Sequence, residues 1–202
     1  MLKDELQSYF DKVYSGSKID TPHSIGGDVH IRFELGGNLG NGTIQRVQQA
    51  TERATAIFND TFPNTNALIY VLIYDYDKSH DEYLYEQFAK EQFARFYNQA
   101  QTINNNYLVD DETRLIIGKL PVAAIYIHNI LNGIANAEMG FDPCINQSIY
   151  FFEPTTDRGF YMYDDRGCYV WSNNADKIRD IYIKRNDWIT EYHRAEIDAY
   201  FL

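Results

Sequence analysis

The chain has 202 residues, of which 45% are hydrophobic, and this length and composition are typical of one globular domain. Its net charge is −11 and its basic residues are not clustered, which disfavours binding to the phosphate backbone of a nucleic acid. The same charge would attract and steer a basic partner protein. We therefore expect a single domain over residues 1–202, with an N-terminal helix and loop over 1–27 and a core over 28–202.

The two cysteines, Cys144 and Cys168, lack the spacing of a metal site or of a disulfide framework. The first residues contain no long apolar run of the kind that forms a secretion signal. No segment is apolar for long enough to span a membrane. We therefore expect a cytoplasmic location, reduced thiols and no contact with a membrane.

Apolar residues at helical spacing predict a short amphipathic helix over 2–14, followed by a loop. Residues 28–35 alternate between apolar and polar side chains, which predicts a half-buried strand. The polar side of this strand carries Asp28, His30, Arg32 and Glu34. Such a row is either a binding or acid/base face, or a solvated face with cross-strand ion pairs.

The segment 36–42 is rich in glycine and asparagine and connects this strand to a predicted helix over 43–60. No lysine precedes Thr43 and Gln45 occupies the place of a third glycine, so neither nucleotide-binding fingerprint is complete and a tight connection is favoured. On the helix, Arg46 and Arg53 are seven residues apart and point the same way. They form either an anion-binding pair or part of a solvated face.

Residues 67–74 are continuously apolar, which predicts a central strand covered on both faces. With the preceding strand and helix it forms a βαβ-like unit whose strands are either adjacent or separated. Four carboxylates follow, at Asp75, Asp77, Asp81 and Glu82. Their spacing differs from that of a calcium-binding loop, so we expect a solvated acidic loop, with no metal and no cofactor.

The middle of the chain contains a predicted aromatic helix over 81–98, a polar loop over 98–107 and a strand over 113–120. Residues 122–127 fit either a strand or the start of a helix that continues to 139 and ends at Gly140.

Three short apolar runs predict an antiparallel meander over residues 148–153, 159–163 and 168–171. The last two runs are joined by a turn that contains Asp164, Asp165 and Arg166. Turn preferences explain these residues without catalysis, and we expect a charged turn that sets the register of two aromatic strands against the tail helix at Trp188. The tail is predicted to be helical, with its apolar face continuing through Tyr192.

Several segments carry a resemblance to a known family. They are His30-Ile-Arg-Phe-Glu-Leu-Gly36, Arg46-Val-Gln-Gln-Ala50, Arg53-Ala-Thr-Ala-Ile-Phe58, Tyr163-Asp-Asp-Arg-Gly-Cys168, Ile181-Tyr182, Trp188-Ile189 and Tyr192-His-Arg194. From residue 28 to the end, the chain resembles a bacterial domain of unknown function, number 3885, seen mainly in Bacillus-like bacteria. The resemblance implies a bacterial cytoplasmic protein and assigns no activity.

The elements together predict an α+β fold with a mixed, largely antiparallel sheet of about five to seven strands. The sheet should contain the C-terminal meander and carry its helices mostly on one face.

Two functions stay open. The first is binding of a basic protein partner, as an immunity or antitoxin protein does, and it rests on the acidic charge, the 17 tyrosines and the missing catalytic motif. The second is an enzyme or small-ligand site built from the strand 28–35, the helix 43–60 and the Asp-Asp-Arg turn. Its residues would be His30, Arg32, Glu34, Arg46, Arg53, Asp164, Asp165 and Arg166. This site requires these groups to converge within about 10 Å around a concave pocket.

Overall fold

The computed structural model describes residues 2–14, 16–76, 82–89, 101–104 and 112–202. Its strands are β1 (Val29–Glu34), β2 (Leu68–Asp75), β3 (Gln101–Asn104), β4 (Glu112–Pro121), β5 (Ser148–Glu153), β6 (Arg158–Asp164) and β7 (Gly167–Ser172). They form one seven-stranded sheet in the order β1-β7-β6-β5-β2-β4-β3, and each neighbouring pair is antiparallel. The predicted α+β class and the C-terminal meander of β5, β6 and β7 are confirmed.

The described helices are α1 (Leu2–Val13), α2 (Ile44–Thr61), α3 (Glu82–Glu86), α5 (Ile127–Met139), α6 (Arg179–Lys184) and α7 (Arg194–Phe201). Short 3-10 turns lie between them: η1 (Pro22–Ser24), η2 (Val122–Ala124), η3 (Ala175–Lys177), η4 (Asn186–Trp188) and η5 (Glu191–His193). Among these described helices, none is long and apolar enough to cross a membrane.

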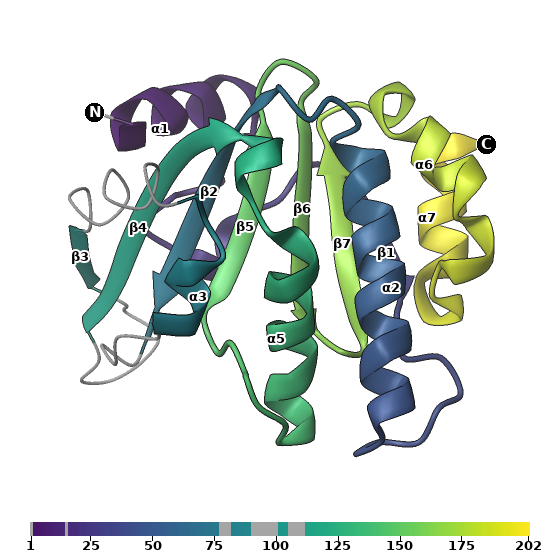
Figure 1. Cartoon of the computed structure of the whole chain (residues 1–202). Helices are drawn as coiled ribbons and strands as arrows, with labels where there is room; N and C mark the ends of the chain where they lie inside the picture. Colours follow the sequence, from purple (N-terminus) through teal and green to yellow (C-terminus); the bar gives the residue numbers. More distant parts are fainter. Residues whose placement is uncertain (1, 15, 77–81, 90–100, 105–111) are drawn as a thin grey trace.

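The larger core lies between the sheet and the helices α2 and α5, which run side by side across one face (Figure 1). The helix α2 begins at Thr43, whose side chain accepts a hydrogen bond from the backbone N–H of Arg46. Its apolar side buries Phe58 against Phe151 of β5 and Phe160 of β6, with the rings edge to face. The helix α5 ends as predicted at Gly140, which has a φ of 70°.

The opposite face of the sheet carries the second core, and α1 supplies its cover. Leu6 and Phe10 of α1 pack there, and the Phe10 ring lies 5.2 Å from the ring of Phe152 on β5. The side chains of β2 alternate between the two cores: Val71 faces the helical layer and Tyr74 faces the side of α1. Most helices therefore lie on one face, and α1 covers part of the other.

The strands β1 and β2 are joined through α2 but are not neighbours, because β7, β6 and β5 lie between them. The C-terminal meander fills this gap, with β5 paired to β2 and β7 paired to β1. The outer edge of β1 is covered in turn, since Phe33 forms a bridge to Ile189 and the N–H of Thr190 donates to Arg32 O.

Four local predictions need correction. Residues 101–104 form β3 at the sheet edge rather than part of a loop. Asp75 is buried in an ion pair with Arg114 and is not solvated, because β2 and β4 bring the two residues together. Tyr192 is 87% exposed and does not continue the apolar face of the tail. The segment 122–127 is a short 3-10 turn that leads into α5. In addition, the helix predicted over 81–98 is wrong at residues 87–89, because α3 ends at Glu86 and Phe88 forms a bridge to Ile125. The part of this predicted helix over 90–98, like Asp77 and Asp81, lies outside the described residues.

Candidate functional site

The face of the sheet that carries α1 is only partly covered, and its uncovered part is rich in tyrosine. On β6, Phe160 and Met162 point into the helical core, so Tyr161 and Tyr163 must point to the other face. These two rings and Tyr169 of β7 are half-buried. We call Tyr161, Tyr163 and Tyr169, with His30 and Arg32 of β1, the open tyrosine face.

Strand register aligns this face in rows. Tyr150 of β5 lies opposite Tyr161, Tyr161 opposite Tyr169, and Tyr169 opposite Arg32. The rings of Tyr150 and Tyr161 are stacked, with their centroids 4.1 Å apart and their planes 10° from parallel. Direct cross-strand neighbours of this kind contact each other, so the row continues from the buried Tyr150 to the half-buried Arg32.

A hollow of about 320 Å³ opens on this face, and its volume is at the small end of the range for ligand pockets. Its lining residues are Ile25, Gly26, Gly27, His30, Tyr150, Tyr161, Tyr169 and Trp171. The Trp171 ring has its place because Gly159, its cross-strand neighbour, has no side chain: a Cβ there would lie 2.0 Å from the indole. Trp171 is 2% exposed, and its Nε1–H has no acceptor among the described residues.

Arg32 lies beside the hollow, next to Tyr169. Its Nε donates to the Tyr163 hydroxyl at 3.0 Å, and its Nη1 lies 3.4 Å from Nδ1 of His193. The guanidinium carbon also lies 5.5 Å from the centre of the Tyr163 ring, a cation–π distance. Burial raises the pKa of Tyr163 to about 12, against the opposing effect of Arg32, so this hydroxyl stays protonated at neutral pH.

His30 forms the edge of the hollow toward α7. Its ring lies 6.0 Å from the Tyr169 ring and 5.9 Å from the Tyr200 ring. Burial lowers the pKa of His30, Glu196 opposes this change, and His193 adds to it. The imidazole is therefore neutral at pH 7 and offers one donor and one acceptor.

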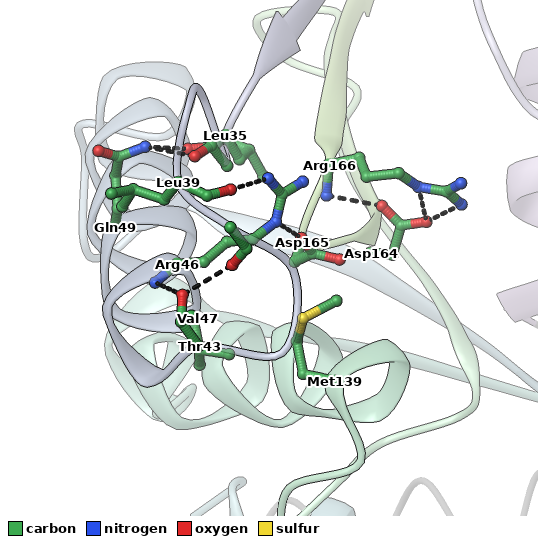
Figure 2. A network of polar contacts seen from close by, with 12 residues as sticks. Leu35, Leu39, Thr43, Arg46, Val47, Gln49, Met139, Asp164, Asp165 and Arg166 are labelled. Carbon is green, nitrogen blue, oxygen red and sulfur yellow. Dashed lines mark hydrogen bonds and ion pairs between the residues drawn. The ribbon is translucent and has the colours of Figure 1, made fainter.

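A second polar network lies at the start of α2 (Figure 2). The Arg46 guanidinium is buried; it forms an ion pair with Asp165 and donates from Nη1 to Leu39 O at 2.7 Å. The Gln49 side chain donates to the carbonyls of Leu35 and Gly36 at 3.0 and 2.8 Å. Side chains of α2 thus hold the glycine-rich loop in place, and this loop acts as a tight connection.

The two carboxylates in the turn of the β6–β7 hairpin also form contacts within the chain. Asp164 accepts the backbone N–H of Arg166 at 2.7 Å and pairs with the Arg166 guanidinium, while Asp165 pairs with Arg46 (Figure 2). Both carboxylates are buried, at 3% and 1% exposure, while Arg166 is exposed, so the charged turn that the sequence predicts holds its acidic groups in ion pairs. Each carboxylate is therefore paired with a different arginine.

The remaining two predicted site residues are on the outside of the β1–α2 connection. Arg53 donates from Nη1 to Glu34 O at 3.1 Å, and the Glu34 side chain is exposed. The Arg53 guanidinium also lies 5.3 Å from the centre of the Trp188 ring, and Arg185 lies on that ring at 4.6 Å. The Trp188 ring therefore contacts two arginine side chains, and the expectation that the hairpin is set against this ring stays a prediction.

The eight predicted site residues thus take part in separate contacts and do not form one site. His30 and Arg32 share the open tyrosine face, whereas Arg46 and Asp165 form a buried ion pair with each other. The residues that line the hollow, Tyr161, Tyr169 and Trp171, are absent from the predicted set. The spacing of the aromatic residues could have predicted this shared surface, because side chains at every second position of a strand lie on one face.

Other chemistry has less support. Among the described residues, no group of three histidine, cysteine or acidic side chains could hold a metal ion. Cys168 is fully buried, and burial raises the pKa of its thiol, so it is unreactive.

The fold and this face define the protein as an α+β domain with one antiparallel sheet and a partly uncovered aromatic surface. It belongs to the family described as Domain of unknown function (DUF3885), whose family model matches residues 6–193, so the resemblance found in the sequence is confirmed. The uncharacterized protein YnaE of Bacillus subtilis (strain 168) is 43% identical over 44 residues, which are 22% of this chain and 21% of YnaE. The chain therefore aligns with about a fifth of that relative. No solved structure matches the chain.

Proposed function

We propose that this chain is a binding protein that recognises a basic protein partner through the open tyrosine face, as an immunity or antitoxin protein of the bacterial cytoplasm would. One observation carries the proposal. Tyr161 and Tyr169 stay half-buried around a hollow, although α1 covers the neighbouring part of the same sheet face.

Tyrosine rings with wet hydroxyls are favourable contact residues, because they bury a large apolar area and lose little side-chain entropy. Their faces also attract cations. The chain itself uses this contact, since Lys119 lies 4.8 Å from the centre of the Tyr70 ring and Arg32 lies over Tyr163. A lysine or arginine of a partner could occupy the hollow over Tyr161 and Tyr169 in the same way.

The charge of the chain supports a basic partner. A net charge of −11 raises the rate of encounter with a basic surface and lowers it for an acidic one. Catalysis has weaker support, because Asp164 and Asp165 are each neutralised by an arginine.

The test combines a pull-down from the native host with reconstitution from purified components. The partner is identified with the wild-type chain and then titrated against a Tyr161→Ser, Tyr169→Ser double variant. Tyr192→Ser is the matched control, because Tyr192 is exposed and lies outside the hollow.

We expect a basic, stoichiometric partner whose affinity falls at least about tenfold in the double variant and is unchanged in the control. Affinity should also fall as salt is raised. Equal binding of the partner by all three chains, or an acidic partner, would contradict the proposal. So would the recovery of no stoichiometric partner from cells that contain the protein in abundance.

A further inference from the structure

Arg32 has surroundings that differ from those of most arginines in the described part of the chain. Arg32 is half-buried and has no carboxylate within ion-pair distance among the residues that the structure describes. The other described arginines each pair with a carboxylate, except Arg53. In an acidic chain an arginine without a counter-ion is unexpected, because a buried charge is costly unless it is paired.

The hydrogen-bond partners that Arg32 has are not carboxylates. They are the Tyr163 hydroxyl, which receives Nε, and the imidazole of His193, which lies near Nη1. The other terminal nitrogen, Nη2, has no hydrogen-bond partner within the described part of the chain. The guanidinium therefore keeps its positive charge and at least one donor available.

Arg32 also lies beside the hollow. Tyr169, its cross-strand partner, lines the hollow, and so does His30, which lies two residues away on the same side of β1. Two acidic groups at this edge act on other residues: Asp164 is paired with Arg166, and Glu196 acts on His30. A single ligand could thus contact both an aromatic hollow and an unpaired guanidinium.

We infer that the open tyrosine face contains a binding subsite for an aromatic carboxylate, with the ligand ring in the hollow against Tyr161 and Tyr169 and its carboxylate on Arg32. Arginine is suited to this role, because its planar group donates to both oxygens of a carboxylate. The inference goes beyond the proposed function and does not depend on a basic partner; the ligand ring would take the place in the hollow that a lysine or arginine of a partner would otherwise occupy.

Arg53 provides a matched control. It is the other described arginine without a carboxylate partner, but its guanidinium lies on the Trp188 ring and it does not line the hollow. A general loss of positive charge would be the same for Arg32→Gln and Arg53→Gln, whereas loss of the subsite would occur only for Arg32→Gln.

The experiment titrates the whole chain with 4-hydroxyphenylacetate and, separately, with its uncharged amide. Binding is followed by calorimetry and by the indole N–H signals in nitrogen–proton NMR spectra, of which the chain has only two because it contains two tryptophans. Trp171 lines the hollow and Trp188 does not, so the two signals distinguish binding in the hollow from binding elsewhere. Thermal melts establish that each variant is folded.

We expect the acid to shift the Trp171 signal alone and to bind at least about tenfold more tightly than the amide. Arg32→Gln should remove this difference, Arg53→Gln should retain it, and Arg32→Lys should keep part of it. Equal affinity for acid and amide, an unchanged preference in Arg32→Gln, or no shift of the Trp171 signal by any acid tested would overturn the inference.

A second set of titrations distinguishes whether the carboxylate belongs to a small molecule or to the C-terminus of a protein. A short peptide that ends in tyrosine is compared in its free-acid and amidated forms. Binding of the small acid indicates a small-molecule ligand. Binding of the free-acid peptide alone indicates the C-terminus of a protein, and the chemistry of the subsite is the same in both cases.

Discussion

Two halves of one sheet face contain similar aromatic residues but differ in burial: α1 covers one half, and the other half stays open. On β5, Phe152 is completely buried, because α1 lies across it with Phe10 and Tyr14. On β6 and β7, Tyr161 and Tyr169 occupy the same face and stay half-buried around the hollow. Aromatic content alone therefore does not separate a buried core from a half-buried surface; the position of the covering helix does.

The covered half is closed by a buried carboxylate, Asp157, in the turn between β5 and β6. It accepts hydrogen bonds from the hydroxyls of Tyr14 and Tyr9 on the α1 side, and from Ser172 at the end of β7 at 3.0 Å. Lys177 adds an ion pair at 3.2 Å. One side chain therefore ties α1 to the meander, and the open half has no equivalent among the described residues.

The largest expected difference between the halves comes from removing one ring in each. Phe152→Ala should lower the free energy of unfolding by about 3–5 kcal/mol, because it leaves a cavity in a closed core. Tyr169→Ala should cost less than about 1 kcal/mol, since a half-buried ring at a surface leaves space that water can fill. Urea denaturation checks both, and equal losses would remove the distinction between the halves.

Removal of the carboxylate that closes the covered half should have the next largest effect. Asp157→Ala should cost about 3 kcal/mol, because it leaves several buried donors without an acceptor and places alanine at a φ of 56°. Asp176→Ala is the control, since Asp176 is exposed and pairs only with Arg179. If the two variants unfold at the same urea concentration, Asp157 does not hold α1 in place.

The border of the open half is tested at the hairpin turn. Gly167→Val should cost about 1–3 kcal/mol by overpacking, because a Cβ there would lie 2.2 Å from the Tyr163 hydroxyl and 2.7 Å from Phe33 O. Asp164→Asn should be milder, since the amide oxygen can still accept the Arg166 N–H. Thermal melts compare them, and unchanged melting of both would refute this role of the turn.

The smallest effect concerns His30 and pH. Because burial lowers the pKa of His30 in the folded chain, the unfolded chain binds the proton more readily. The stability that this residue contributes is complete above its ordinary pKa of 6.5 and is lost as the pH falls below that value. His30→Gln should therefore reduce the loss of stability between pH 7.5 and pH 5.5, and an unchanged loss would contradict the assignment.

Local pattern was sufficient for most elements of the fold. The alternation over 28–35 predicted β1, the apolar run over 67–74 predicted β2, and the spacing after Thr43 predicted α2. These predictions succeeded because side-chain periodicity reflects which side of an element is buried, and this is a property of neighbouring residues. The sequence also predicted the meander, since its turns join strands that are adjacent in the chain.

Tertiary structure alone decided which polar residues meet. Arg46 and Asp165 are 119 residues apart, and Arg32 and Tyr163 are 131 apart, so no local pattern indicates either contact. The sheet separates β1 from β2 with three strands of the meander, which places Arg32 beside Tyr169 and leaves Arg46 on the helical side. The sequence by itself determined that the protein has a tyrosine-rich antiparallel meander; the position of α1, held at Asp157, determined which of its aromatic rings are buried and which stay half-buried.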